Sequence, residues 1–135
     1  MRNAELIEYQ IVFDGGSKGN PGPGYGSFAI FHSDELVLQE QIELGEWVTN
    51  NEAEYRTLVK ALERLLTLVG DRRKETRVTI YGDSQLVVNQ VNGLWKIKKP
   101  ELFALRNQVV ELLNQVGKAE VKWHSRVHSV AVLGH

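Results

Sequence analysis

The sequence predicts an α/β protein in which a mixed β-sheet is covered by helices. Three observations support this fold class. Three strand-like segments come first, helical segments then alternate with single strands, and one long segment has a clear amphipathic helical period. The 135 residues, 42% of them hydrophobic, suffice for one core and are too few for two domains. We therefore expect a single domain over residues 1–135.

The first third of the chain predicts an antiparallel meander. Residues 6–13 are mostly apolar and β-prone, and residues 14–24, which contain five glycines and two prolines, predict a tight loop that begins at Asp14. Strand-like residues 25–32 and 36–44 follow, joined by a short polar turn. Neighbouring strands joined by such short connections are expected to pair in antiparallel fashion.

Helical periodicity dominates the rest of the chain. Apolar residues recur at helical spacing from Tyr55 to Val69, and Gly70 ends this helix. A short strand at 78–81 leads into a helix that runs from Ser84 to about Val91. Pro100 begins a third helix, and residues 121–123 predict the last strand.

Composition excludes several classes of protein. The absence of cysteine excludes disulfides, thiolate zinc sites and a cysteine nucleophile. No apolar run approaches eighteen residues and no secretory signal is evident, so we expect a cytoplasmic protein without a membrane span. The net charge of −1 argues against a domain that coats nucleic acid by bulk electrostatics. Residues 1–71 nevertheless carry twelve acidic against five basic residues, whereas residues 72–135 carry eleven basic against five acidic.

Acidic residues lie at the ends of three predicted elements. Asp14 ends the first strand, Glu52 and Glu54 lie in the first turn of the long helix, and Asp83 follows the strand at 78–81. Each has a structural interpretation, as a turn residue or as a helix cap. Capping boxes fit both Thr49 with Glu52 and Asn51 with Glu54, and either Asp83 or Ser84 fits a cap of the following helix.

Together these carboxylates predict a metal centre. The carboxyl ends of neighbouring strands and an adjacent helix start converge on one edge of an α/β sheet. Carboxylates held so closely repel one another unless a cation neutralises them, and oxygen ligands favour Mg²⁺ or Mn²⁺. Two such ions support phosphodiester hydrolysis.

Three blocks of sequence resemble type 1 ribonuclease H. They are Phe13-Asp14-Gly15-Gly16-Ser17, Thr49-Asn50-Asn51 followed by Ala53-Glu54-Tyr55, and Tyr81-Gly82-Asp83-Ser84-Gln85-Leu86-Val87. The resemblance covers about residues 5–126. It implies a ribonuclease H-like sheet of five strands, three antiparallel and then two parallel, flanked by helices. It also implies an endonuclease that cuts the RNA strand of RNA/DNA hybrids with two Mg²⁺ ions, or Mn²⁺ as a substitute, leaving 3′-hydroxyl and 5′-phosphate ends.

The resemblance assigns roles to individual residues. Asp14, Glu54 and Asp83 match the catalytic, metal-binding carboxylates, which leaves Glu52 as a capping residue. Thr49 matches a pocket for a DNA-strand phosphate, and Trp95 matches an aromatic beside the DNA backbone, although a packed surface aromatic is the alternative. Short polar groups suit recognition of RNA 2′-hydroxyls in the minor groove. The implied substrate-binding set is Gly15, Ser17, Asn20, Thr49, Asn50, Asn51, Ser84, Gln85 and Trp95.

A basic cluster follows Trp95. Lys96, Lys98 and Lys99 are placed to face phosphate, although such clusters are often solvated loops. The basic helical insertion that some family members carry at this point is absent, because Lys99 runs directly into Pro100. We therefore expect weak, strongly salt-sensitive binding of hybrids.

The C-terminal stretch, residues 127–135, departs from the family pattern. Counting from Arg126 puts Ser129 at the family's asparagine position and Leu133 at its fourth aspartate, and no carboxylate side chain follows Glu120. β-Branched Val127, Val130 and Val132 favour an extended tail. By the resemblance, His128 and, next, His124 match the family's mobile loop histidine, although surface residues without a role are the alternative. Three interpretations stay open: a chain truncated or altered after Arg126, a three-carboxylate core assisted by His124, His128 or His135, and hybrid binding without efficient cleavage.

Functions of other classes remain in competition. One is a domain that binds RNA/DNA hybrids or double-stranded RNA, its catalysis impaired by the missing fourth ligand. Another is the nuclease domain of a larger polymerase or integrase-like protein. The chain begins only a few residues before its first strand and shows no linker, so a stand-alone monomer is the expectation.

Overall fold

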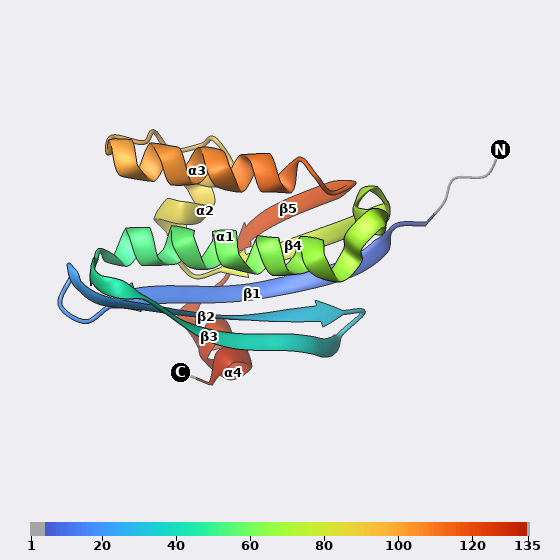
Figure 1. The fold of residues 1–135 in the computed structure, drawn as a ribbon, viewed down its shortest axis with the longest axis horizontal. Helices are drawn as coiled ribbons and strands as arrows, with labels where there is room; N and C mark the ends of the chain where they lie inside the picture. Colours follow the sequence, from blue (N-terminus) through green and yellow to red (C-terminus); the bar gives the residue numbers. More distant parts are fainter. Residues whose placement is uncertain (1–4, 135) are drawn as a thin grey trace.

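Within residues 5–134, which the computed structural model describes, five strands form one sheet in the order β3-β2-β1-β4-β5 (Figure 1). The strands pair antiparallel from β3 to β1 and parallel from β1 to β5. The predicted mixed sheet is therefore confirmed. The strands are β1 (Ile7–Ser17), β2 (Gly22–His32), β3 (Glu35–Val48), β4 (Thr76–Gly82) and β5 (Lys118–Trp123).

Helices cover both faces of this sheet. Helices α1, α2 and α3 lie on one face, and α4 lies on the other, against β1 and β2 (Figure 1). No helix within the described residues is both long and apolar enough to cross a membrane. The helices are α1 (Asn50–Val69), α2 (Gln85–Val91), α3 (Pro100–Leu113) and α4 (Arg126–Leu133), and a short 3-10 helix, η1 (Gly70–Glu75), follows α1.

Successive side chains of β1 point to opposite faces of the sheet, so the strand contributes to two separate apolar clusters. Ile11 and Phe13 belong to the large cluster that also contains the buried side of α1. Val12 points the other way, into a small cluster with Ala29 and Leu133. Because Asp14 follows Val12 by two residues, it lies on the α4 side of the strand.

The first strand is longer than the sequence indicated. The loop predicted to begin at Asp14 begins only at Lys18, since β1 continues through Gly15, Gly16 and Ser17. This segment stays in the sheet because it pairs with the start of β2, up to the Ser17–Gly24 pair. Backbone pairing outweighs the low strand propensity of two glycines.

The prediction of an extended tail was wrong. Residues from Arg126 to Leu133 form α4, which buries Ser129 and Leu133. The helix propensities of valine residues cost only a few tenths of a kcal/mol each, roughly, so burial of one helix face overrides them. Gly134 ends the helix in the left-handed conformation, with φ of 83°.

Candidate metal centre and active site

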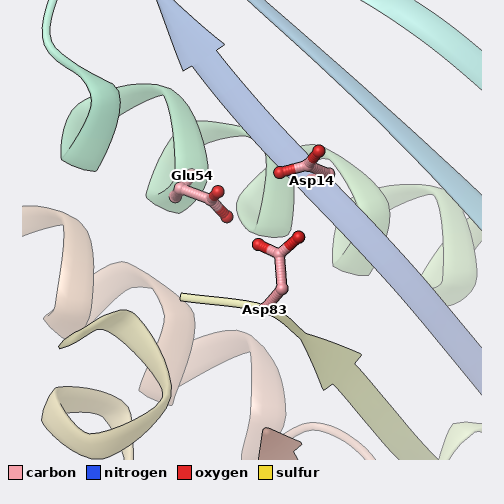
Figure 2. Close-up of side chains that lie close together, drawn as sticks. All are labelled: Asp14, Glu54 and Asp83. Atoms are coloured by element: carbon pink, nitrogen blue, oxygen red, sulfur yellow. The ribbon is translucent and has the colours of Figure 1, made fainter. Parts of the chain in front are cut away.

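The structure brings three of the predicted residues into one acidic cluster. Asp14 on β1, Glu54 on α1 and Asp83 after β4 each offer a carboxylate oxygen within 4.8 Å of the others. Figure 2 shows the three side chains pointing toward one another from these separate elements. We call these three residues the acidic cluster.

Strand register and a close helix contact create the acidic cluster. Phe13 pairs with Gly82 across the parallel β1–β4 ladder, so the residues that follow, Asp14 and Asp83, leave the ladder side by side. Helix α1 approaches β1 at Gly15, where an added Cβ would lie 2.6 Å from the Ala53 carbonyl oxygen. A glycine at this point lets α1 bring Glu54 to the strand.

Burial and mutual repulsion shape the electrostatics of the cluster. The pKa of Glu54 is raised well above 4.5, chiefly by burial and next by the charge of Asp14. The pKa of Asp83 is also raised by burial and by Asp14, while a hydrogen bond from Ser129 and the charge of Arg126 act in the opposite direction. The neighbouring positive charge thus does not balance the burial and mutual repulsion of the three carboxylates.

Two oxygens of the cluster have no hydrogen bond. Among the described residues, Glu54 Oε2 and Asp83 Oδ2 are buried without a hydrogen-bonding partner. Buried polar atoms are nearly always hydrogen-bonded, so these two oxygens are available to bind a ligand. Carboxylate oxygens are the ligands that Mg²⁺ and Mn²⁺ prefer, so the residues present fit a metal ion.

Helix α4 contributes two groups that sequence reasoning missed. Arg126 Nη1 lies 3.9 Å from Asp14 Oδ2 and 3.8 Å from Asp83 Oδ2. The Ser129 hydroxyl is fully buried and hydrogen-bonded to Asp83. The polar residues before Arg126 were a signal for a helix start, but nothing local indicated that this helix would fold back over the acidic cluster.

The two matched histidines differ in their surroundings. His124 Nε2 lies 2.8 Å from Ser129 Oγ, and its ring stacks on Tyr81. Burial and the neighbouring His128 lower the pKa of His124. His128 is exposed, with Nδ1 3.4 Å from Ser125 Oγ. His124 is thus linked to the cluster through Ser129, while a role for His128 stays a prediction; His135 lies outside the described residues.

Several predicted substrate-binding residues meet at the start of α1. The Ser17 backbone N–H donates to Asn50 Oδ1 at 2.8 Å, and the Asn50 backbone N–H donates to Asn20 Oδ1 at 2.9 Å. These bonds fasten the β1–β2 loop to the helix beside the acidic cluster. Gly15 lies in the same segment of β1, against α1.

Two helix caps predicted from the sequence are confirmed. Thr49 and Glu52 form a capping box at the start of α1, so the Thr49 hydroxyl is engaged by its own helix. Ser84 caps α2 by accepting from the Val87 backbone N–H at 3.2 Å. Gln85 is the first residue of α2 and is exposed.

The basic cluster lies beside the start of α1. Lys96, Lys98 and Lys99 line one pocket together with Asn51. Trp95 precedes them in the loop after α2 and is 47% exposed, so its side chain is open to a ligand as well as packed on one side. Contacts between these residues and a substrate stay predictions.

Comparison with known proteins places this chain in a defined family. Residues 12–132 match the family model described as reverse transcriptase-like. A ribonuclease HI of Helicobacter pylori is 33% identical over 131 residues, which are 96% of this chain and 82% of that protein. The chain therefore belongs to the ribonuclease H family.

Other relatives agree in fold and differ in length. A bifunctional protein of Mycobacterium tuberculosis is 38% identical over 120 residues, covering 88% of this chain but only 32% of its own length. The first curated relatives matched are thus much longer than this chain, which spans 32% to 48% of them. The solved structure of LC11 ribonuclease H1 in complex with an RNA/DNA hybrid superposes with a TM-score of 0.84 at 27% identity, covering 91% of this chain and 89% of that one.

Proposed function

We propose that this chain is an endonuclease that hydrolyses the RNA strand of RNA/DNA hybrids. The observation that carries the proposal is the acidic cluster, in which three buried carboxylates from separate elements meet and two oxygens lack hydrogen bonds. Membership of the ribonuclease H family and the similarity to a ribonuclease H1 solved with a hybrid support the same substrate. The proposed chemistry is thus phosphodiester hydrolysis.

The proposed cofactor is a pair of Mg²⁺ ions, with Mn²⁺ as a substitute. Asp14, Glu54 and Asp83 would hold them. When bound, such ions would activate a water and stabilise the leaving oxygen. Attack of this water on phosphorus with departure of the 3′-oxygen would leave 3′-hydroxyl and 5′-phosphate ends. The chain itself orients the ligands: the Ser129 hydroxyl holds Asp83, and the close approach of α1 to β1 at Gly15 brings Glu54 to Asp14.

Substrate contacts are proposed for the polar groups around the acidic cluster. Ser17, Asn20 and Asn50 form a rigid hydrogen-bonded set whose amides and hydroxyl suit RNA 2′-hydroxyls. The lysines that line a pocket with Asn51 suit the backbone phosphates of the DNA strand. A monomeric state and a cytoplasmic location belong to the proposal as expectations from the sequence.

One observation favours a second function, binding of hybrids or double-stranded RNA with impaired cleavage. Leu133, which stands at the family's fourth carboxylate position, is buried in an apolar cluster with Val12 and Ala29. Within residues 5–134, no carboxylate on α4 replaces it. A weaker metal centre would follow if three carboxylates hold the ions less tightly than four.

A cleavage assay decides between the two functions. Labelled RNA/DNA hybrid, double-stranded RNA and double-stranded DNA are each incubated with Mg²⁺, Mn²⁺ or chelator. We expect cleavage of the hybrid's RNA strand with either metal and none with chelator. Binding of hybrid without cleavage in either metal would select the second function.

Substitution of the cluster tests the mechanism. Asp14→Asn and Asp83→Asn each remove one ligand charge at nearly constant shape, and we expect hybrid cleavage to fall by roughly a hundredfold or more. Asp34→Asn makes the same chemical change in the β2–β3 turn, where Asp34 has φ of 71°, and serves as the matched control. Parent-level cleavage by either cluster variant would contradict the proposed mechanism.

A further inference from the structure

A cation from α4 reaches the acidic cluster. Arg126 Nη1 lies 3.9 Å from Asp14 Oδ2 and 3.8 Å from Asp83 Oδ2. The side chains of Asp14 and Asp83 are only 5% and 8% exposed, whereas that of Arg126 is 68% exposed. The guanidinium therefore spans from solvent to two buried carboxylates that also belong to the candidate metal centre.

The contact is electrostatic and loosely held. Both distances exceed hydrogen-bond length, and Asp83 Oδ2, one of the two oxygens facing Arg126, has no hydrogen bond. The charge of Arg126 acts to lower the pKa of Asp83, against burial. The guanidinium thus offsets part of the repulsion within the cluster from beyond hydrogen-bond distance of either oxygen.

Helix α4 does not depend on this contact for its position. Leu133 packs against Val12 and Ala29, and the buried Ser129 hydroxyl bonds both Asp83 and His124. Arg126 is the first residue of the helix, about one turn before Ser129 and two turns before Leu133. Movement of the guanidinium therefore leaves the helix in place.

We propose that Arg126 is a built-in counter-cation of the metal centre, which neutralises Asp14 and Asp83 when no ion is bound and which a divalent cation displaces. A guanidinium and a metal ion that share the same two carboxylates repel each other at short range. Arg126 thereby stabilises the ion-free protein and weakens the apparent affinity for the metal. The inference rests on the proposed function only in requiring that the cluster bind divalent ions.

Calorimetric titration with Mg²⁺ and with Mn²⁺, without nucleic acid, measures the competition. We expect Arg126→Gln to bind the ion about threefold to tenfold more tightly than the parent, because one nearby positive charge is removed. In chelator, the same variant should melt at a lower temperature than the parent, since the carboxylates lose their counter-cation. Arg126→Lys keeps the charge on a group that cannot span both carboxylates. Its affinity for the ion should lie between those of the parent and Arg126→Gln.

A matched control separates this contact from a general loss of charge. Arg77→Gln removes an arginine from β4 that pairs with Glu8 and Glu120 at 3.5 Å, and it should leave the affinity for the ion unchanged. An unchanged or weaker affinity in Arg126→Gln, or an equal gain in Arg77→Gln, would overturn the inference. If the parent itself binds neither ion, the metal centre and the proposed function fail with it, which is a different result.

A direct signal of displacement comes from the side chain itself. The Arg126 Nε–H resonance of the parent, followed by nuclear magnetic resonance, should shift during titration with Mg²⁺ and reach its midpoint at the calorimetric Kd. The Arg77 resonance should stay in place. An Arg126 resonance that does not respond to saturating Mg²⁺ would rule displacement out.

Discussion

At the scale of single residues, Glu54 is the member of the acidic cluster whose ionisation is strongly disfavoured by folding. Its carboxyl is buried in α1 beside Asp14, and these two causes raise its pKa well above 4.5. In the unfolded chain the same group ionises at its ordinary pKa. Folding without metal therefore becomes less favourable as the pH rises above this ordinary pKa, at which Glu54 of the unfolded chain loses its proton.

This pKa shift predicts a pH dependence of stability. Between about pH 4.5 and the raised pKa, the folded state holds a proton that the unfolded state has lost, so the free energy of unfolding falls as pH rises through that window. Glu54→Gln should remove the part of this decline that Glu54 causes, while the raised pKa of Asp83 leaves a decline in both proteins. Urea unfolding in chelator from pH 4.5 to 8 measures both slopes.

The comparison with Glu54→Gln also removes a competing effect. The lowered pKa of His124 makes stability rise with pH, but it does so in both proteins, so the difference between them reports Glu54. Saturating Mg²⁺ should abolish the decline in the parent, because the ion favours the ionised carboxylates. Equal slopes in the parent and the variant would contradict the assigned burial of Glu54.

The contact between β1 and α1 decides the position of the cluster at the scale of elements. Gly15 allows the Ala53 carbonyl to approach where a Cβ would lie 2.6 Å away. Backbone atoms on both sides leave no flexible group to move aside. The neighbouring Gly16 differs, because its Cβ would meet the tip of the half-exposed Tyr25 side chain.

This difference predicts unequal effects of two alanine substitutions. Gly15→Ala should lower the free energy of unfolding by about 1–3 kcal/mol, since overpacking forces α1 from the strand. Gly16→Ala, the matched control, should cost less than about 1 kcal/mol because Tyr25 turns toward solvent. Urea unfolding of both variants measures the effect, and a larger loss in Gly16→Ala would show that α1 is not held at Gly15.

On helix α4, the apolar side chain of Leu133 stands at the position where the family has its fourth carboxylate. Leu133 is 3% exposed and packs with Val12 and Ala29. Leu133→Ala should lower the free energy of unfolding by about 2–3 kcal/mol through lost burial and a cavity. Leu133→Asp should lower it further, because the carboxylate enters an apolar cluster.

Amide hydrogen exchange over residues 126–133, together with urea unfolding, measures the anchoring of α4. Greater loss of protection in Leu133→Asp than in Leu133→Ala is expected. The opposite order, accompanied by tighter Mg²⁺ binding in Leu133→Asp, would mean that this position can serve as a fourth metal ligand. The anchoring role assigned to Leu133 would then be wrong.

The distribution of charge governs binding at the scale of the whole molecule. A net charge of −1 leaves no general attraction for a polyanion, so a few placed groups must provide it. Lys96, Lys98 and Lys99 share a pocket with Asn51 at the start of α1. They are therefore the expected contacts for DNA phosphates.

Salt dependence of hybrid binding tests these contacts. The slope of log K against log salt should be negative, and Lys98→Gln should reduce its magnitude by roughly one. Lys60→Gln, which removes a lysine paired with Glu63 on α1, is the matched control and should leave the slope unchanged. An affinity that is the same at low and high salt would contradict phosphate binding by this pocket.

The sequence by itself determined the features that depend on near neighbours in the chain. Thr49 and Glu52 cap α1 through residues three apart, and the helical period from Tyr55 to Val69 is a local pattern. The order of elements as far as β5 and the three motifs around Asp14, Glu54 and Asp83 were likewise visible, because each motif is contiguous. These features predicted the mixed sheet and the residues of the acidic cluster.

The tertiary structure alone decided the features that depend on distant partners. Gly15 and Gly16 stay in β1 because β2 pairs with them, and α4 forms because Leu133 finds Val12 and Ala29 more than a hundred residues earlier. The same packing carries Arg126 to Asp14 and Asp83. Local propensity cannot report such contacts, since burial and backbone pairing outweigh the small preferences of single glycines and valines.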